Sequence, residues 1–208
     1  MIYTGFTPHS KQQEMIHGIL NSTAKYHVAC VGRQFGKSLM GINLALYWAI
    51  NNNNVKILWV SPVYAQASKV QKEIIQAISQ SGIVKSANYS SNEIVLKNGS
   101  EIIFRSAERY DNIRGMTEAI KPVFLVKGKK VLFISTPKGS NWFKNLFQLG
   151  KSYDNVNYEA YTGSSYDTPY IDKSEIEDAK KTLPENVFKQ EYLAEFIDSG
   201  GEVFANID

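Results

Sequence analysis

The sequence has little cysteine, and long apolar runs are absent from it. Cys30 is the single cysteine among 208 residues, which excludes an internal disulfide framework and a cysteine-rich zinc site. No stretch approaches the roughly 18 consecutive apolar residues of a membrane-spanning helix. Residues 1–6 have neither the basic start nor the apolar run of a signal peptide. We therefore expect a soluble intracellular protein of a reducing compartment, the cytoplasm by default.

A strong charge bias is absent as well. The chain has 23 Lys and Arg against 20 Asp and Glu, which gives a formal net charge of +3. This balance excludes a dedicated nucleic-acid-coating protein, whose excess of basic residues would be much larger. Hydrophobic residues make up 43% of the chain, enough for the core of one domain of ordinary size. A small appended subdomain is compatible with this length, but a second full domain is not.

Apolar β-forming segments alternate with segments of helical period along most of the chain. The expected strands are 26–31, 55–61, 93–96, 101–104, 130–135 and 158–161, and the expected helices are 10–20, 37–50, 66–79, 175–181 and 186–196. This alternation is typical of a parallel sheet covered by helices. The glycine-containing turn at 97–100 predicts an antiparallel hairpin, which we place at the sheet edge. The sequence therefore predicts an α/β fold with a mainly parallel sheet flanked by helices.

The segment Gly32-Arg33-Gln34-Phe35-Gly36-Lys37-Ser38 lies between an expected strand and an expected helix. This is the context that a nucleotide phosphate loop requires, because main-chain N–H groups at a helix start form a cradle for phosphate oxygens. Lys37 would reach the terminal phosphates, and the Ser38 hydroxyl would coordinate a Mg²⁺ ion that bridges them. Arg33 adds a second cation beside the cradle. The pattern therefore predicts a triphosphate site.

The match to the standard G-x-x-x-x-G-K-[ST] pattern is imperfect, since Val31 stands where that pattern has glycine and Gly32 is displaced by one position. A glycine-containing turn before a core helix is the plain alternative for the whole segment. For Arg33 the alternative is a solvated loop arginine, which is common at protein surfaces.

Three further segments accompany the phosphate loop in a fixed order. They are Phe6-Thr7-Pro8-His9-Ser10-Lys11-Gln12, Ile134-Ser135-Thr136-Pro137-Lys138-Gly139 at the end of an expected strand, and Gly200-Gly201-Glu202-Val203-Phe204. Together with the Arg-Gln that precedes Gly36-Lys37-Ser38, these segments resemble the N-terminal ATPase domain of the large terminase subunit of tailed bacteriophages. The resemblance covers essentially the whole chain. It implies a P-loop NTPase fold of the ASCE, RecA-like type.

The resemblance also implies roles for individual residues. Gln12, preferred over Gln13, would pair with the adenine edge, although an exposed polar residue at a helix start is the alternative for either one. Ser135 and Thr136 would sense the terminal phosphate, with a capping turn as the alternative. The nucleotide-binding set that follows is Gln12, Gly32, Arg33, Gln34, Phe35, Gly36, Lys37, Ser38 and Leu39.

An arginine finger is part of the same expectation. Arg114 matches the arginine thought to reach a neighbouring subunit's nucleotide in this family, where it would stabilise charge in phosphoryl transfer. Arg33, Arg105 and Arg109 are rivals for that role, and Arg114 paired with a nearby acid is the plain alternative. The expected catalytic set is Lys37, Arg33, Arg114, Ser135 and Thr136.

The acidic residues that ATP hydrolysis needs are not found at the end of an apolar strand. Glu118-Ala119 resembles the end of an Asp-Glu-Ala motif, but no strand precedes it, and we assign no catalytic role to Glu118. In the family, the stretch that matches residues 114–117 leads into the acidic strand, whereas here Thr117 runs directly into Glu118. We therefore expect a segment to be missing near 117/118, with unusually wide Cα spacing there.

The domain organisation follows from these segments. We expect a P-loop ATPase core at 1–165, followed by a C-terminal helical lid or linker subdomain at 166–208 that leads to an absent nuclease domain. The implied function is an ATP-driven motor that translocates double-stranded viral DNA into a procapsid.

The resemblance also implies ligands and partners. ATP and Mg²⁺ are the expected cofactors; double-stranded DNA, the portal protein and the small terminase subunit are the expected partners. A pentameric ring is expected on assembly and a monomer in isolation, in the host cytoplasm and transiently at the procapsid portal. Lys121, Lys138 and the run 127–130 could contact DNA phosphates, with a solvated loop as the alternative.

Two other functional classes stay open. A superfamily-2 helicase shares the glutamine segment and the phosphate loop, but it needs a second motor lobe that this length cannot supply. A non-catalytic nucleotide-binding domain fits the residues as they stand, because the catalytic acid is absent from them.

Overall fold

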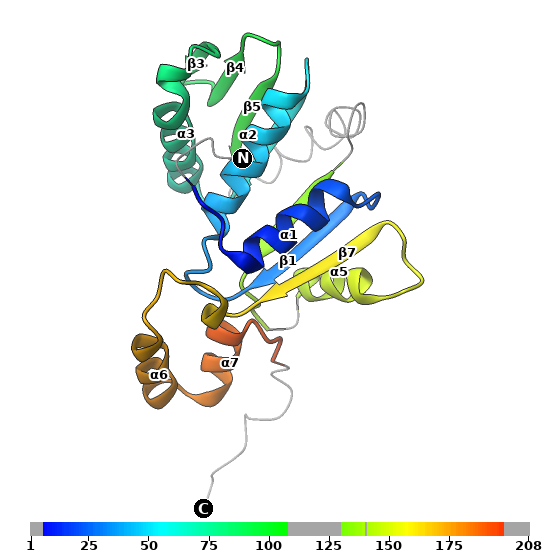
Figure 1. Ribbon diagram of the computed structural model, residues 1–208, viewed down its shortest axis with the longest axis vertical. Helices are drawn as coiled ribbons and strands as arrows, with labels where there is room; N and C mark the ends of the chain where they lie inside the picture. Colours follow the sequence, from blue (N-terminus) through cyan, green and yellow to red (C-terminus); the bar gives the residue numbers. More distant parts are fainter. Residues whose placement is uncertain (1–5, 108–129, 140, 198–208) are drawn as a thin grey trace, which may run out of the picture. The chain divides into compact units, whose positions relative to one another are not determined.

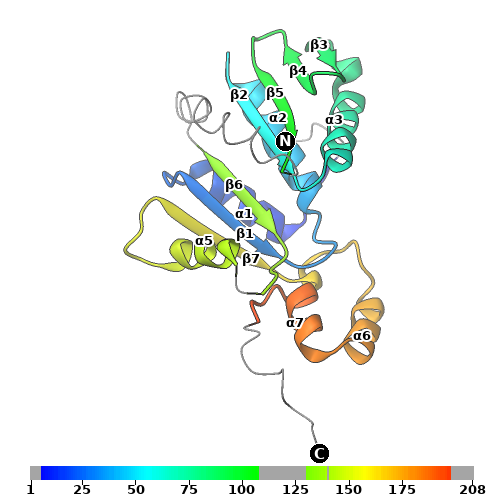
Figure 2. The same cartoon turned by 180° about the vertical axis from the view of Figure 1, so that it is seen from behind.

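The computed structural model describes residues 6–107, 130–139 and 141–197 (Figures 1 and 2). The chain forms two compact units. One contains residues 38–129 together with residues 1–7, and the other contains residues 8–37 and 130–208. Each unit has its own β-sheet. The predicted domain boundary at residue 165 is a different division and stays a prediction.

Sheet A of the second unit has three parallel strands in the order β6-β1-β7. Their bounds are β1 Tyr26–Val31, β6 Val131–Ser135 and β7 Tyr158–Gly163. Strand β1 is central, and its apolar residues from Val28 to Val31 are completely buried. A run of apolar residues without alternation is what a strand covered on both faces requires. The predicted strand 26–31 is therefore confirmed, with the same bounds.

Two helices cover sheet A from opposite faces (Figures 1 and 2). They are α1 Ser10–Asn21 and α5 Trp142–Lys151. Met15 and Ile19 of α1 are completely buried, and Phe143 of α5 packs with Val28 and Cys30 of β1. Helix α5 was not predicted. Its signal is Asn141, whose side chain accepts hydrogen bonds from two main-chain amides of the first helical turn and so begins the helix.

The remainder of the second unit is a small helical region. It contains the 3₁₀ helix Ser165–Asp167, α6 Lys173–Thr182 and α7 Glu185–Leu193. Ile171, Ile176 and Phe188 form its buried cluster. Helix α7 is followed by Ala194, which adopts a left-handed conformation with φ of 60° and caps the helix end. Both late helices were predicted, with bounds that differ by a few residues.

Sheet B of the first unit is mixed, in the order β2-β5-β4-β3. Its strands are β2 Lys56–Ser61, β3 Val84–Asn88, β4 Glu93–Leu96 and β5 Glu101–Ser106. Strands β2 and β5 are parallel, and β4 is antiparallel to β5, as the hairpin prediction required. Strand β3 lies outside β4 and was not predicted, since its mostly exposed sequence lacks apolar alternation.

Helices α2 Lys37–Asn51 and α3 Tyr64–Ile78 form one apolar cluster with sheet B. Residues 40–46 of α2 are buried without interruption, so the prediction of a helix covered on most sides is confirmed. Ile74 of α3 and Phe104 of β5 are almost completely buried in this cluster. No helix within the described ranges has the length and apolar character to cross a membrane.

Strand β6 differs from its prediction as a buried strand. Each of its five residues is only half-buried. The physical reason is its position, because β6 pairs with β1 on one side and is the outer strand of sheet A among the described residues. Apolar residues such as Leu132 and Ile134 are unusual on the open edge of a parallel sheet. The predicted gap near 117/118 lies outside the described residues.

A buried histidine makes the stability of the second unit depend on pH. His27 of β1 is completely buried, and its ring nitrogens lie 3.1 Å from the Ala24 carbonyl oxygen and 3.2 Å from the Tyr161 hydroxyl. Burial, together with the positive charge of the nearby Lys130, lowers the pKa of His27 from 6.5 to about 4. The folded protein therefore holds this histidine neutral in a pH range where the unfolded chain protonates it.

We predict that the free energy of unfolding contributed by His27 is fully present above pH 6.5 and is lost as the pH falls toward 4. Over this pH range the free energy of unfolding of the wild type should fall by at most about 3 kcal/mol relative to that of His27→Gln. Urea denaturation at several pH values measures this difference. The exposed His17→Gln is the matched control and should follow the wild type. Parallel curves for wild type and His27→Gln would contradict the assignment.

Candidate nucleotide-binding site

The phosphate loop begins where β1 ends and leads into α2. Gln34 and Gly36 have positive φ values of 56° and 86°. Within the described part of the chain, the N–H groups of Gln34, Phe35 and Gly36 have no hydrogen-bond acceptor. Left-handed residues interspersed along such a loop turn successive N–H groups toward one concave side, which is suited to an anion. The start of α2 adds the positive end of a helix dipole.

The first two residues of the loop are used differently. The Gly32 N–H donates to the Gly163 carbonyl oxygen at 2.8 Å, and the Arg33 N–H donates to the Glu191 carbonyl oxygen at 2.6 Å. A Cβ atom at Gly32 would lie 2.6 Å from the main-chain oxygen of Tyr192. Glycine is therefore needed at position 32 for close packing of the main chain.

Lys37 lies at the centre of the site. Its ammonium group donates to the Gly32 carbonyl oxygen and to the Thr136 hydroxyl oxygen, both at 2.8 Å. Burial lowers the pKa of Lys37, the negative charge of Glu191 acts in the opposite direction, and Arg33 again lowers it. An ammonium has three donors, so one donor remains for a further acceptor.

The predicted sensor residues lie beside Lys37. Thr136 follows directly after β6 and receives the lysine hydrogen bond, while the Ser135 hydroxyl donates to the Thr136 carbonyl oxygen. Ser135 is opposite Cys30 in the parallel register of β6 and β1. The carboxyl ends of two neighbouring parallel strands therefore meet at the lysine, which is where ligands bind in open α/β sheets.

Gln12 lies beneath the loop and is completely buried. Its amide nitrogen donates to the Phe35 carbonyl oxygen at 2.9 Å, and its amide oxygen accepts from the His9 N–H at 3.1 Å. The Phe35 side chain is also buried, and the His9 ring packs edge-on against it, with 4.8 Å between the ring centroids. The observed contacts of Gln12 thus hold the main chain of the loop.

The remaining predicted side chains around the loop are exposed. They are Arg33, Gln34, Ser38 and Leu39, of which Leu39 is 38% exposed. The hydroxyl of Ser38 lies in the first turn of α2, directly after Lys37. Arg33 lies close enough to Lys37 for its positive charge to lower the pKa of the lysine.

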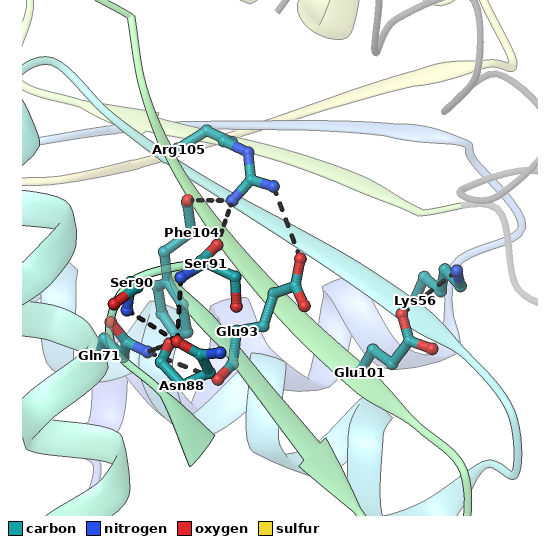
Figure 3. A network of polar contacts seen from close by, with 9 residues as sticks. All are labelled: Lys56, Gln71, Asn88, Ser90, Ser91, Glu93, Glu101, Phe104 and Arg105. Carbon is teal, nitrogen blue, oxygen red and sulfur yellow. Dashed lines mark hydrogen bonds and ion pairs between the residues drawn. The ribbon is translucent and has the colours of Figure 1, made fainter. Parts of the chain in front are cut away.

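Among the arginine-finger candidates, Arg105 is held by its own sheet (Figure 3). Its guanidinium donates to the main-chain oxygens of Ser91 and Phe104 at 3.0 and 2.8 Å and lies 3.7 Å from the Glu93 carboxylate. These contacts hold the Arg105 side chain against the main chain and the acidic residue of its own unit. Arg114 and Arg109 lie outside the described residues, as do Glu118, Lys121 and the first three residues of the basic run 127–130.

Several residues of the site were not predicted. The Ser165 hydroxyl donates to the Arg33 carbonyl oxygen at 2.7 Å, and the Gln190 side-chain oxygen accepts from the Gly139 N–H at 2.9 Å. Both residues come from the helical region beyond residue 163. They bind main-chain atoms, and such contacts leave no motif in the sequence.

The comparisons with known proteins agree with this geometry. The family model for the terminase large subunit, T4likevirus-type, N-terminal, matches residues 28–123. The large terminase subunit of Escherichia phage T5 is 31% identical, with 96% of this chain and 50% of the relative covered. This chain belongs to the terminase large-subunit family. It spans about half the length of the curated terminase relatives it matches.

Solved terminase structures share the fold. The large terminase ATPase domain of Thermus phage P74-26 matches with a TM-score of 0.73 at 25% identity, and 94% of this chain and 96% of that one are covered. The large terminase of another thermophilic bacteriophage, in complex with ATP-gamma-S, matches with a TM-score of 0.69 over 92% of this chain and 53% of that one. At 14% identity, this second likeness shows the fold alone. The α/β, P-loop fold class is therefore confirmed.

The terminase alignments are longer than the chain itself. The match to the T5 subunit extends over 221 residues and that to the large subunit of Thermus virus P23-45, at 26% identity, over 258, whereas this chain has 208. The P23-45 match covers 98% of this chain and 52% of the relative. Both relatives therefore contain internal segments that have no counterpart here.

The Gln12 contact allows a sharp test of the loop geometry. A Cβ at Gly36 would lie 2.5 Å from the Gln12 amide nitrogen, whereas a Cβ at Gly82, with φ of 69°, meets nothing within 4 Å. We predict that Gly82→Ala costs about 1–2 kcal/mol of stability from its left-handed backbone alone. Gly36→Ala should cost about 1–3 kcal/mol more because of the added contact.

The measurement is a double-mutant cycle with Gln12→Ala, followed by urea denaturation. Removing the glutamine side chain should recover much of the extra loss in Gly36→Ala and nothing in Gly82→Ala. Equal losses for the two glycine variants would show that the Gln12 contact does not constrain the loop.

Proposed function

We propose that this chain is the ATP-hydrolysing part of a viral DNA-packaging motor. The observation that carries the proposal is the position of Lys37, whose ammonium joins the end of β1 to the end of β6 beside unused loop amides. A site of this kind provides positive charge and aligned N–H donors for a triphosphate. The P74-26 relative is an ATPase domain and the T5 relative is a large terminase subunit, which supports the same activity.

The triphosphate would be held mainly by main-chain groups. The amides of Gln34, Phe35 and Gly36 would bind phosphate oxygens, and Lys37 would use its remaining donor on the terminal phosphates. The exposed Arg33 would add charge stabilisation from the solvent side. A phosphate oxygen that draws the Lys37 ammonium away from the Thr136 hydroxyl would leave that hydroxyl without its lysine donor. We propose that Ser135 and Thr136 sense the terminal phosphate through this exchange of hydrogen bonds.

A Mg²⁺ ion fits the site through Ser38. Magnesium in nucleotide sites takes one or two protein ligands, and phosphate oxygens and water complete its shell. The hydroxyl of the exposed Ser38, adjacent to Lys37, can supply one ligand. The ion would neutralise charge that develops on the phosphates during transfer. No cluster of three acidic, His or Cys residues suited to a metal is found among the described residues.

The base would lie near the start of α1. We propose that Gln12 acts in nucleotide binding by holding Phe35 in place, with pairing to adenine available to its second amide hydrogen. Gly32 and Leu39 complete the proposed nucleotide-binding set, Gly32 through close packing of the loop and Leu39 through the first turn of α2.

The catalytic acid would come from a segment beyond the 208 residues of the printed sequence, since both relatives contain internal segments without a counterpart in them. The half-buried apolar edge of β6 supports the proposal, because an additional strand paired there would cover it. We place this segment between Thr117 and Glu118. Sequencing of peptides from the intact protein by mass spectrometry should recover an intervening strand with an Asp-Glu pair; a peptide that joins Thr117 directly to Glu118 would contradict this.

The wider assignment extends to the whole protein. We propose that the intact subunit acts on double-stranded DNA with a portal protein and a small terminase subunit. It would assemble as a pentameric ring in which Arg114 reaches a neighbouring nucleotide, in the host cytoplasm and at the procapsid portal. The division into a core at 1–165 and a helical subdomain at 166–208 belongs to the same proposal.

We predict that the intact protein hydrolyses ATP with a requirement for Mg²⁺ and that Lys37→Ala lowers kcat/KM at least about 100-fold. The expected cause is the loss of the cation that joins the two strand ends. The matched control is Lys151→Ala at the exposed end of α5, which should retain wild-type turnover. Nucleotide binding without turnover in the wild type would favour a non-catalytic domain, and separation of DNA strands would favour a helicase.

A further inference from the structure

Two neighbouring residues of α7 contact the two loops that line the phosphate site. The Glu191 carbonyl oxygen accepts from the Arg33 N–H of the phosphate loop at 2.6 Å. The Gln190 side-chain oxygen accepts from the Gly139 N–H at 2.9 Å, in the loop that follows β6. In Figures 1 and 2, α7 lies beside the ends of β1 and β6. One turn of helix thus bridges two loops that are far apart in the sequence.

The Gln190 contact holds the segment that carries the Lys37 partner. Between Thr136 and Gly139 the chain passes through the buried Pro137, whose fixed backbone angle limits the freedom of this segment. Gly139 has a left-handed backbone conformation, with φ of 54°. The hydrogen bond from its N–H to the Gln190 side chain fixes the position of this residue. The Thr136 hydroxyl receives the Lys37 ammonium at the other end of the same segment. Displacement of Gly139 would therefore shift the acceptor of the lysine.

The Glu191 side of the bridge is insensitive to side-chain chemistry, since it uses a main-chain oxygen. It is reinforced by the Cys30 thiol, which donates to the Ala194 carbonyl oxygen at 3.5 Å, and by the close approach of Gly32 to Tyr192. The phosphate loop is thus attached to α7 through the main chain, and the loop after β6 is attached through one side chain. Gln190 is the part of the bridge that a substitution can remove.

We propose that Gln190 is a positioning residue for ATP hydrolysis, which fixes the loop after β6 so that Thr136 stays in register with Lys37 and the terminal phosphate. Its side chain contacts the Gly139 N–H, so it would act through Gly139 and Thr136. This inference rests on the proposed function. It adds that α7 sets the position of the Thr136 acceptor of Lys37 through the loop after β6.

The test compares Gln190→Leu and Gln190→Glu in the intact protein. Leucine keeps the approximate size but has no acceptor, whereas glutamate keeps an oxygen that can accept from Gly139. We expect Gln190→Leu to lower kcat for ATP about 10-fold with KM changed less than about 2-fold, because the amide cradle remains intact. Gln190→Glu should recover most of this loss. The exposed Gln148→Leu in α5 is the matched control and should retain wild-type kcat.

Amide hydrogen exchange gives a second readout that does not depend on turnover. The Gly139 N–H should exchange faster in Gln190→Leu than in Gln190→Glu or the wild type. Unchanged kcat in Gln190→Leu, or equal losses in the leucine and glutamate variants, would overturn the inference while the proposed function stands. Absence of turnover in the wild type would instead overturn the proposed function, and the positioning role with it.

Discussion

The hydrogen bonds of one half-buried ammonium group hold the proposed site together. Lys37 donates to the carbonyl oxygen just after β1 and to the hydroxyl after β6, so a single cation joins two neighbouring strand ends. Burial opposes this charge, as the lowered pKa of Lys37 shows. The two acceptors and the charge of Glu191 offset part of that penalty. The negative charge of a bound triphosphate would favour the charged ammonium further, which is the physical reason for placing it there.

The residues around Lys37 have different roles. The first residues of the phosphate loop are hydrogen-bonded to the main chain of β7 and α7, whereas the N–H groups of residues 34–36 have no acceptor in the part of the chain that the structure describes. Gln12 and the buried ring of Phe35 support the loop from below. A loop held this firmly at one end needs little rearrangement to receive an anion, and preorganised donors of this kind are the main source of electrostatic catalysis. The same rigidity makes the contacts of α7 relevant to the chemistry.

Much of this arrangement could be predicted from the sequence, because periodic apolar segments and a short motif determine it. The bounds of β1 follow from its unbroken apolar run, and the phosphate loop follows from Gly36-Lys37-Ser38 between a strand and a helix. Strand β3 could not be predicted, since an exposed edge strand has no apolar alternation. The contacts of Ser165 and Gln190 could not be predicted either, because they bind main-chain atoms of distant segments and tertiary packing alone brings them together. The need for glycine at position 32 likewise depends on the approach of Tyr192.

The central claim concerns which amides face the phosphates. Residue-resolved hydrogen exchange of the intact protein, with and without a non-hydrolysable ATP analogue, tests it most directly. The account predicts that the analogue protects the N–H groups of Gln34, Phe35 and Gly36. The N–H groups of Gly32 and Arg33 should change little, because they are already bonded to Gly163 and Glu191. Binding of the analogue that leaves residues 34–36 unprotected would contradict the account.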